Sequence, residues 1–288
     1  MLKKIDASKL FLDEHLHLLQ CPYCQSPFIN MEGYSLVCAK GHHFDLSKKG
    51  TLHLMKQAAN TDYNRDLFTH RYLLAQSGFF TPLLASLEPY FSHLASDGLI
   101  VDIGCGEGSQ LAWLQEKFAL SSTVGMDIAK EGIALASNHF ANSAFWCLAD
   151  LAQLPFANQS CSLLLNVLTP SHYQEFKRVL KEGGVFIKVV PGSNYLNELR
   201  QILYRSQPEK QTYNNQDIIN RFFQECPGAS QSSITYQVDL TPDIYGHLLH
   251  MTPLFWGASS EDKAYSLQNP LTSITVDYTI LVYKHILD

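Results

Sequence analysis

The chain has 288 residues, of which 46% are hydrophobic and 17% are charged, and its formal net charge is −6 at pH 7. This length can hold one large α/β domain with a small appendage, and the negative charge argues against a strongly basic nucleic-acid-binding protein. No apolar run approaches the ~20 residues that a membrane-spanning helix needs, and no signal-peptide core follows the first residues. We therefore expect a cytoplasmic protein without a membrane partner.

The seven cysteines are an odd number and cluster only near the N-terminus. This distribution favours a reducing compartment and one metal site over a disulfide framework. The charges are also unevenly spread, because residues 1–72 contain nine basic and seven acidic residues, whereas residues 73–288 contain twelve and twenty. An RNA partner would therefore meet less repulsion at the N-terminal part.

Two close pairs of potential metal ligands follow a short amphipathic arm at residues 2–19, and thirteen residues separate the pairs. A hairpin at residues 28–37 would bring them together in the tetrahedral arrangement that Zn²⁺ requires. His43 is an alternative fourth ligand, but a Cys-x₃-His spacing favours His42, and free cysteines without metal are the remaining interpretation. We expect a structural zinc ribbon that sits apart from the rest of the chain, with the ligands Cys21, Cys24, Cys38 and His42.

A polar segment, residues 56–64, is interpreted as a linker that leads into a helix over residues 66–76. Ser77 and Gly78 are a plausible C-terminal stop for this helix. Arg71 could meet phosphate there, although a solvated helix face is the commoner explanation. The predicted division is an arm and ribbon at 1–55, a linker and helix at 56–76, and a main domain at 77–288.

A short apolar run at residues 99–103 predicts a buried parallel strand, which enters three alternating glycines just before a helix begins at Ser109. A dinucleotide-binding turn needs Gly-x-Gly-x-x-Gly, whereas here the third glycine comes one position early. An acid followed by this spacing resembles the first motif of S-adenosylmethionine (SAM)-dependent methyltransferases. Bare backbone lets the cofactor approach, and nearby acids complement its positive charge. The residues of this motif are Asp102, Gly104, Gly106, Glu107 and Gly108.

Further strand ends fit the same superfamily. Asp127 ends a second strand, where a carboxylate meets the ribose hydroxyls, or caps the helix over residues 129–139. After a third strand, the methyltransferase pattern implies that Asp150 contacts the adenine amino group while Leu151 packs on the ring. Phe80, in the segment before the first strand, is either a lid over the cofactor or a core aromatic residue.

A fourth strand begins at Cys161, and its exit faces the expected position of the methyl group and its acceptor. The candidate residues at this exit are Asn166, Thr169 and Ser171. A glycine turn and a fifth strand follow, and then a helix in which Tyr195 either closes the pocket or anchors the helix. Two alternating segments, 233–240 and 273–283, predict the antiparallel pair that completes the sheet, and residues 251–256 between them are a stacking surface or core.

The combined ribbon, glycine motif and Met251-Thr-Pro-Leu-Phe-Trp256 stretch resembles the RlmA family of 23S rRNA guanine-N1-methyltransferases, and more closely its Gram-positive branch. The resemblance covers nearly the whole chain. It implies a class I SAM-dependent methyltransferase fold, Rossmann-like, with a mostly parallel seven-stranded sheet and the N-terminal zinc ribbon. Carried across, the zinc ligands fall on the four residues named above, and cofactor contacts fall on Gly106, Glu107, Phe80 and Tyr195.

The implied reaction is attack of guanine N1 on the sulfonium methyl group, in hairpin 35 of 23S rRNA, with guanine 748 favoured over guanine 745. Positioning and desolvation should supply most of the rate, with the base flipped onto aromatic side chains. A role in the macrolide or ketolide response and a homodimer are further expectations. The alternatives are a small-molecule methyltransferase with a structural ribbon, and a non-enzymatic RNA- or protein-binding module. No residue stands out as a general base.

Overall fold

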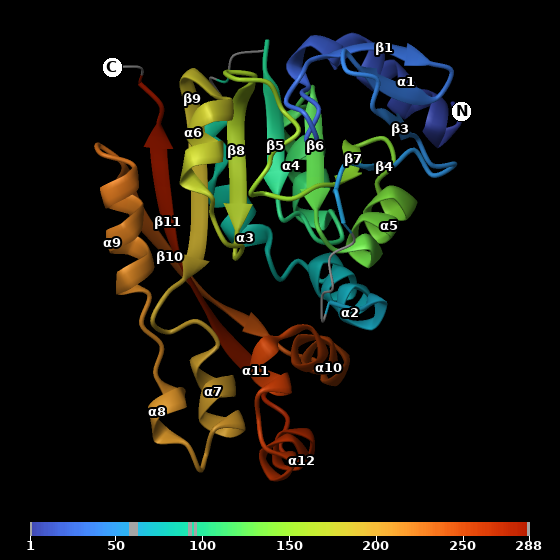
Figure 1. Cartoon of the computed structure of the whole chain (residues 1–288). Coiled ribbons are helices and arrows are strands. Elements are labelled where there is room, and N and C mark those ends of the chain that lie inside the picture. Colours follow the sequence, from blue (N-terminus) through green and yellow to red (C-terminus); the bar gives the residue numbers. More distant parts are fainter. Residues whose placement is uncertain (1, 58–62, 92–93, 95–96, 287–288) are drawn as a thin grey trace.

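The computed structural model describes residues 2–57, 63–91, 94 and 97–286. The predicted linker therefore lies partly outside the described residues, at positions 58–62. Two separate sheets are present (Figure 1): three strands form the order β1-β2-β3, and eight strands form the order β10-β11-β9-β8-β5-β6-β7-β4. The first three are β1 (Phe28–Glu32), β2 (Ser35–Cys38) and β3 (His43–Asp45), and the others are β4 (Leu52–His53), β5 (Leu99–Ile103), β6 (Thr123–Asp127), β7 (Phe145–Leu148), β8 (Cys161–Val167), β9 (Leu180–Pro191), β10 (Ser230–Asp239) and β11 (Ser273–Lys284).

The large sheet is parallel except at one side, where β11 runs antiparallel to both β9 and β10. The chain passes from β5 through β6 to β7 and then crosses to β8 on the other side of β5. This reversal places a crevice beyond the carboxyl end of β5, where open α/β sheets bind ligands. The expected seven strands are all present, and β4 adds an eighth, parallel to β7.

Helices cover both faces of this sheet and extend beyond its carboxyl edge (Figure 1). On one face, α6 and α9 pack on the sheet together with the N-terminal region, and on the other face α3, α4 and α7 pack on it. The helices are α1 (Lys4–His15), α2 (Arg65–Gln76), α3 (Thr81–Ser86), α4 (Ser109–Phe118), α5 (Lys130–His139), α6 (Tyr173–Val179), α7 (Asn197–Leu203), α8 (Pro208–Gln211), α9 (Gln216–Glu225), α10 (Pro242–Met251), α11 (Pro253–Trp256) and α12 (Ser260–Gln268). None of these described helices has both the length and the apolar character to cross a membrane.

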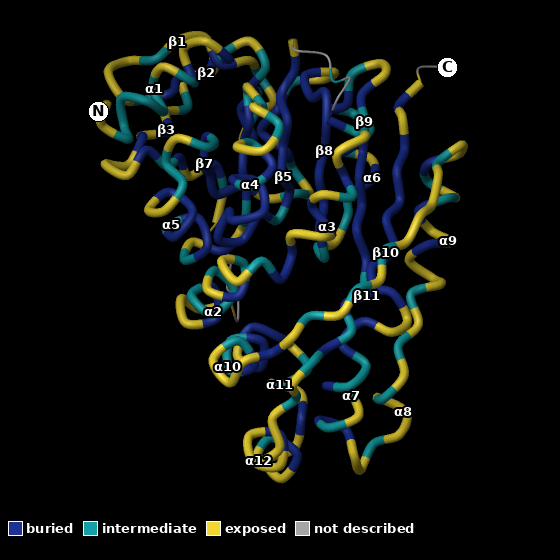
Figure 2. Tube along the Cα trace, turned by 180° about the vertical axis from the view of Figure 1, so that it is seen from behind, coloured by how far each residue is buried: buried dark blue, intermediate teal, exposed yellow. Residues whose placement is uncertain are grey.

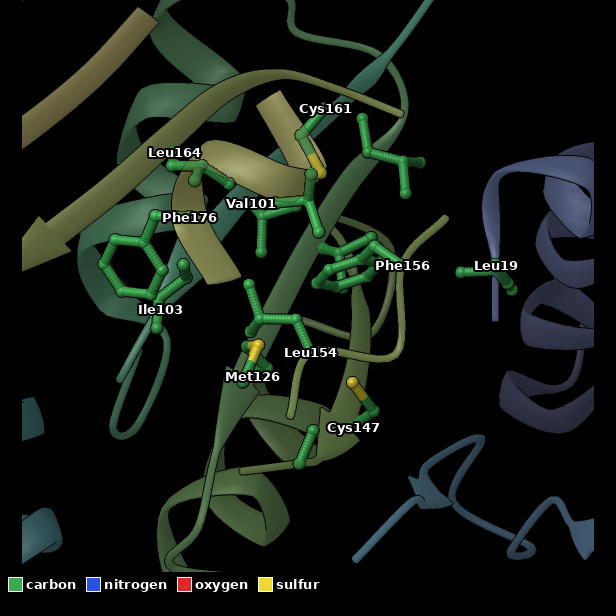
Figure 3. Close-up of a cluster of buried hydrophobic side chains, with 14 of the residues drawn as sticks. Leu19, Val101, Ile103, Met126, Cys147, Leu154, Phe156, Cys161, Leu164 and Phe176 are labelled. Atoms are coloured by element: carbon green, nitrogen blue, oxygen red, sulfur yellow. The ribbon is translucent and has the colours of Figure 1, made fainter. Parts of the chain in front are cut away.

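The ribbon does not sit apart from the sheet, and that expectation is wrong. Ribbon residues Leu36 and Phe44 belong to the same buried cluster as Val101 and Ile103 of β5. Leu19 forms a β-bridge with Phe156, and Figure 3 shows its side chain directed toward this cluster. The small ribbon cannot enclose a core of its own, so it buries its apolar side chains against the large sheet. Figure 2 shows the buried strands of the large sheet in dark blue beside the ribbon.

The predicted glycine turn before the fifth strand is a β-bulge within β9. The strand begins at Leu180, opposite Cys161, and the register shifts before Leu163 pairs with Val185. Gly183 in this segment has φ +73°, a left-handed conformation that glycine adopts without strain. Beyond the other end of β9, the helices α7, α8, α10, α11 and α12 form a lobe next to the crevice (Figure 1).

Candidate functional site

A cavity of about 460 Å³ lies at the carboxyl ends of β5, β6, β7 and β8. Its volume is in the range of small-molecule sites. Helix α2 forms one wall, and the segment that joins α10 to α11 forms another. The residues that line it are Tyr63, Leu67, Phe68, Arg71, Gly104, Gly106, Met126, Asp127, Ile128, Ala149, Leu151, Val167, Leu168, Thr169, Pro170, Pro191, Tyr195, Arg200, Met251, Thr252, Pro253 and Leu254.

The glycine turn forms the floor of this cavity between β5 and α4. Gly104, Gly106 and Gly108 all have left-handed φ angles, from +57° to +84°. A Cβ atom at Gly104 would lie 2.4 Å from the Thr169 side chain, and one at Gly108 would lie 2.6 Å from Trp146. The turn therefore needs glycine both for its backbone conformation and for its close packing.

Asp127, at the end of β6, connects the glycine turn to the next helix. Its two carboxylate oxygens each accept a 2.8 Å hydrogen bond, one from the backbone N–H of Gly106 and the other from that of Ala129. Burial raises the pKa of Asp127, and these two N–H groups oppose that rise. The residue also lines the cavity, so the structural role and the predicted ribose contact are compatible.

Three carboxylates interact electrostatically with a single guanidinium, that of Arg71, at the cavity wall. Asp102 is 2% exposed and Glu107 is 1% exposed, and Asp127 is the third. Arg71 Nε lies 3.0 Å from Glu107 Oε2, but the angle is poor, so neither atom has a hydrogen-bond partner among the described residues. Burial raises the pKa of Asp102 to about 7; Arg71 lowers it, and the other two carboxylates add to the rise.

This arrangement fits the charged end of SAM. The cofactor carries an ammonium, a carboxylate and a sulfonium, with a net positive charge. Unused hydrogen-bonding capacity on Arg71 and Glu107 suits the carboxylate and ammonium respectively. The excess of buried negative charge favours a cationic ligand. The donors, acceptors and volume of the cavity therefore match the predicted cofactor.

A buried lysine, Lys188, donates hydrogen bonds to the segment at the end of β8, where we expect the methyl acceptor to bind. Lys188 Nζ donates hydrogen bonds to Asn166 Oδ1 at 2.8 Å, to the Thr169 carbonyl oxygen at 2.9 Å and to Ser171 Oγ at 2.8 Å. Burial lowers the pKa of Lys188 to about 8. The three predicted acceptor-site residues are thus gathered by one cation, but only Thr169 lines the cavity.

The structure brings only some of the predicted cofactor residues to the cavity wall. Phe80 is 2% exposed and packs in the core, where its ring lies 5.5 Å from the Arg71 guanidinium. Asp150 is exposed, and its carboxylate accepts a hydrogen bond from the Ala152 N–H. The predicted contacts of both residues with cofactor stay predictions. The predicted cofactor residues that line the cavity are Gly104, Gly106, Asp127, Leu151 and Tyr195, together with the predicted acceptor-site residue Thr169. The other predicted cofactor residues, which do not line it, are Phe80, Asp102, Glu107, Gly108 and Asp150.

Helix α2 supplies residues that the sequence reasoning missed or undervalued. Leu67, Phe68 and Arg71 all face the cavity, and the solvated-face interpretation of Arg71 is wrong because its side chain is 19% exposed and pairs with Glu107. Arg71 follows Phe68 by three positions and Leu67 by four, and residues at these spacings lie on the same face of a helix. That pattern could have identified them, whereas nothing local to Lys188 or Arg200 indicates a site.

The ribbon gathers the predicted metal ligands into one cluster. The sulfur atoms of Cys24 and Cys38 lie 3.7 Å apart, and His42 Nδ1 lies 3.4 Å from Cys38 Sγ and 3.7 Å from Cys21 Sγ. Zinc–ligand bonds of ~2.3 Å to sulfur and ~2.0 Å to nitrogen imply tetrahedral edges of about 3.5 to 3.8 Å. The donor set therefore fits Zn²⁺. His43 lies on β3 with its side chain exposed.

Comparison with known proteins agrees with both parts of the chain. Residues 101–188 match a family model described as "Methyltransferase domain" and residues 19–57 match one described as "RlmA, N-terminal". "Putative 23S rRNA (guanine-N(1)-)-methyltransferase YxjB" of Bacillus subtilis (strain 168) is 37% identical over 273 residues, covering 92% of this chain and 96% of that protein. The 23S rRNA (guanine(748)-N(1))-methyltransferase of Streptomyces fradiae is 28% identical over 256 residues, covering 85% and 88%.

Among solved structures, one described as a "putative methyltransferase" from Bacillus halodurans C-125 aligns with a TM-score of 0.47 and 13% identity, covering 71% of this chain and 99% of that chain.

Proposed function

We propose, from the premise that this chain belongs to the RlmA family of 23S rRNA guanine-N1-methyltransferases, that its substrate is guanine 748 of 23S rRNA. The chain is a SAM-dependent methyltransferase with an N-terminal zinc ribbon. What supports guanine 748 is the similarity to the 23S rRNA (guanine(748)-N(1))-methyltransferase of Streptomyces fradiae. Methyl transfer between two bound ligands is supported by the cavity, which joins the glycine turn and its buried acids to the exit of β8. One ligand can therefore sit on the turn while a second enters from the side of α11.

SAM supplies an electrophilic methyl group on its sulfonium. The glycine turn would hold the cofactor, Asp127 would meet its ribose hydroxyls and Leu151 would pack on its adenine ring. Transfer would form the bond between guanine N1 and the methyl carbon as the C–S bond breaks with its electron pair on sulfur, and the N1 proton would go to solvent. Val167, Leu168 and Pro170 line the methyl side of the cavity and exclude water from this step.

Exposed aromatic side chains at the rim fit a flipped-out base. Tyr63 and Trp256 are 47% and 40% exposed, and their ring centres are 6.3 Å apart. A guanine must leave its stack and pair before N1 is accessible, and aromatic rings stabilise the exposed base. We propose that these two rings receive the substrate and that Thr169 lies beside it.

The test is transfer of labelled methyl groups from SAM to 23S rRNA that lacks the modification, followed by mass mapping of nuclease fragments. We expect one methyl group on N1 of guanine 748. Label at guanine 745 would refute the proposed site within the same hairpin. Label only in a small-molecule extract, or label nowhere, would overturn the RNA substrate. Gly104→Val is the inactive control, because its side chain would collide with Thr169.

Three further expectations stand beside this proposal. We keep the division into an arm and ribbon at 1–55, a linker and helix at 56–76 and a methyltransferase domain at 77–288. A homodimer and a cytoplasmic location stay predictions. An altered macrolide or ketolide response would follow from methylation of guanine 748, and growth assays in strains with and without the enzyme measure it.

A further inference from the structure

We propose that the contact between α2 and α10 holds a divalent transition-metal ion on Asp66, His70 and His250, separate from the zinc ribbon. Each of these residues offers one ligand atom, and the three atoms lie within 4.8 Å of one another. The site has the chemical class of Zn²⁺, Co²⁺ or Ni²⁺, because imidazole and carboxylate donors suit these ions. Mg²⁺ and Ca²⁺ prefer oxygen ligands alone.

Helical spacing brings the ligands together from two elements. Asp66 and His70 are one turn apart on α2, and His247 and His250 are about one turn apart on α10. Asp66 Oδ1 lies 3.7 Å from His70 Nε2, and the rings of His70 and His250 stack with centres 4.6 Å apart. Ligands at ~2.0–2.1 Å from a tetrahedral ion are about 3.3 Å apart, so the site closes when the two imidazole rings turn out of their stack and direct their nitrogen lone pairs at one ion.

His247 supplies the supporting contact that metal-bound histidines usually have. Its Nδ1 lies 2.9 Å from His70 Nδ1, and a hydrogen bond between two imidazole nitrogens requires one to donate and the other to accept. When His70 Nδ1 donates, its Nε2 keeps a lone pair that faces the Asp66 carboxylate. A cation between these two atoms relieves their repulsion and favours this tautomer, in which His247 Nδ1 accepts the hydrogen bond from His70.

A bound ion would link two helices that both line the cavity. Helix α2 contributes Leu67, Phe68 and Arg71 to the wall of the cavity, and α10, which packs against α2, ends at Met251, which also lines the cavity. An ion that bridges the two helices fixes this wall. The Asp66 side chain is 72% exposed, so water can complete the coordination and the ion can enter from solvent.

The experiment counts ions on the full chain with Co²⁺ as the probe. We expect two Co²⁺ per chain, one with the thiolate absorption of the ribbon and one with nitrogen and oxygen ligands only. His70→Ala and His250→Ala should each remove the second ion and keep the first, whereas Cys38→Ser should do the reverse. His247→Ala should weaken the second ion about 10- to 100-fold. His17→Ala, an exposed histidine elsewhere, is the matched control and should keep both.

One ion per wild-type chain, or a second ion retained in both His70→Ala and His250→Ala, would overturn the proposal. Circular dichroism checks that each variant is folded, and His250→Gln replaces His250→Ala if that variant is not. The count does not depend on methyl transfer, so it is independent of the proposed RNA substrate.

Discussion

Asp102 should make SAM binding depend on pH. Its pKa of about 7 in the protein without cofactor reflects burial first and then the neighbouring carboxylates. A cationic ligand favours the ionised form and lowers that pKa. Binding below about pH 7 must therefore expel a proton from Asp102, and affinity should rise as the pH rises.

The magnitude follows from the size of this pKa. If the bound form stays ionised, the apparent Kd is about elevenfold above its high-pH limit at pH 6 and about twofold above that limit at pH 7. The ratio between pH 6 and pH 8 is about tenfold. At pH 7 binding should release about half a proton. Stability changes in the same window: the raised pKa stabilises the cofactor-free protein at low pH, and this contribution is lost as the pH rises from about 4 through about 7.

Calorimetry measures both quantities, because titrations in buffers of different ionisation enthalpy report the protons released. Asp102→Asn should remove the slope between pH 6 and pH 8 and weaken binding at pH 8. Asp13→Asn, an exposed acid paired with Lys9 on α1, should keep the wild-type slope. An unchanged slope in Asp102→Asn, or a wild-type affinity that is flat over this range, would refute the assignment of the proton to Asp102.

Three other substitutions test the charges and the core. Arg71→Met should destabilise the fold by about 3–5 kcal/mol, because it leaves Glu107 as an unpaired buried charge. Adding Glu107→Gln should recover most of this loss of stability, as measured by denaturant titration. If the double variant is no more stable than Arg71→Met, the pairing of the two residues is contradicted. Lys188→Met should lower kcat more than it raises the Kd for SAM, and should cost about 1–3 kcal/mol of stability because the Thr169 carbonyl oxygen loses its donor, while Asn166 and Ser171 keep their mutual hydrogen bond. Lys284→Met, at an exposed position, should change neither the kinetics nor the stability. Cys38→Ser should lower the melting temperature of the whole chain in one transition, since the ribbon shares its core with β5; a separate ribbon transition with an unchanged main melt would contradict this.

Local spacing explains why much of the fold and part of the site were predictable. The glycine turn, its preceding strand and Asp127 lie within about thirty positions of one another in the sequence, and their backbone requirements leave few alternatives. The metal ligands of the ribbon also follow from a short spacing. In both cases the residues that form the pattern in the sequence also form the local structure that it predicts.

Contacts between distant segments were not predictable in this way. Lys188 meets the β8 exit only because β8 and β9 are adjacent in the sheet, and Arg71 meets Glu107 because α2 packs against the turn. The core shared by the ribbon and β5 likewise depends on tertiary packing. Such pairs have no fixed separation along the chain, so only the assembled fold identifies them.

The short strand β4 connects the ribbon to the edge of the large sheet. It pairs with β7 through residues 52 and 53, and the Leu54 N–H donates to the Leu148 carbonyl oxygen. Exposed strand edges are sites of self-association. If loss of zinc releases the segment after the ribbon, the edge of β7 becomes available to the same edge of another molecule. Zinc-starved cells would then accumulate this enzyme as aggregates, and the supply of one ion would set the amount of usable enzyme.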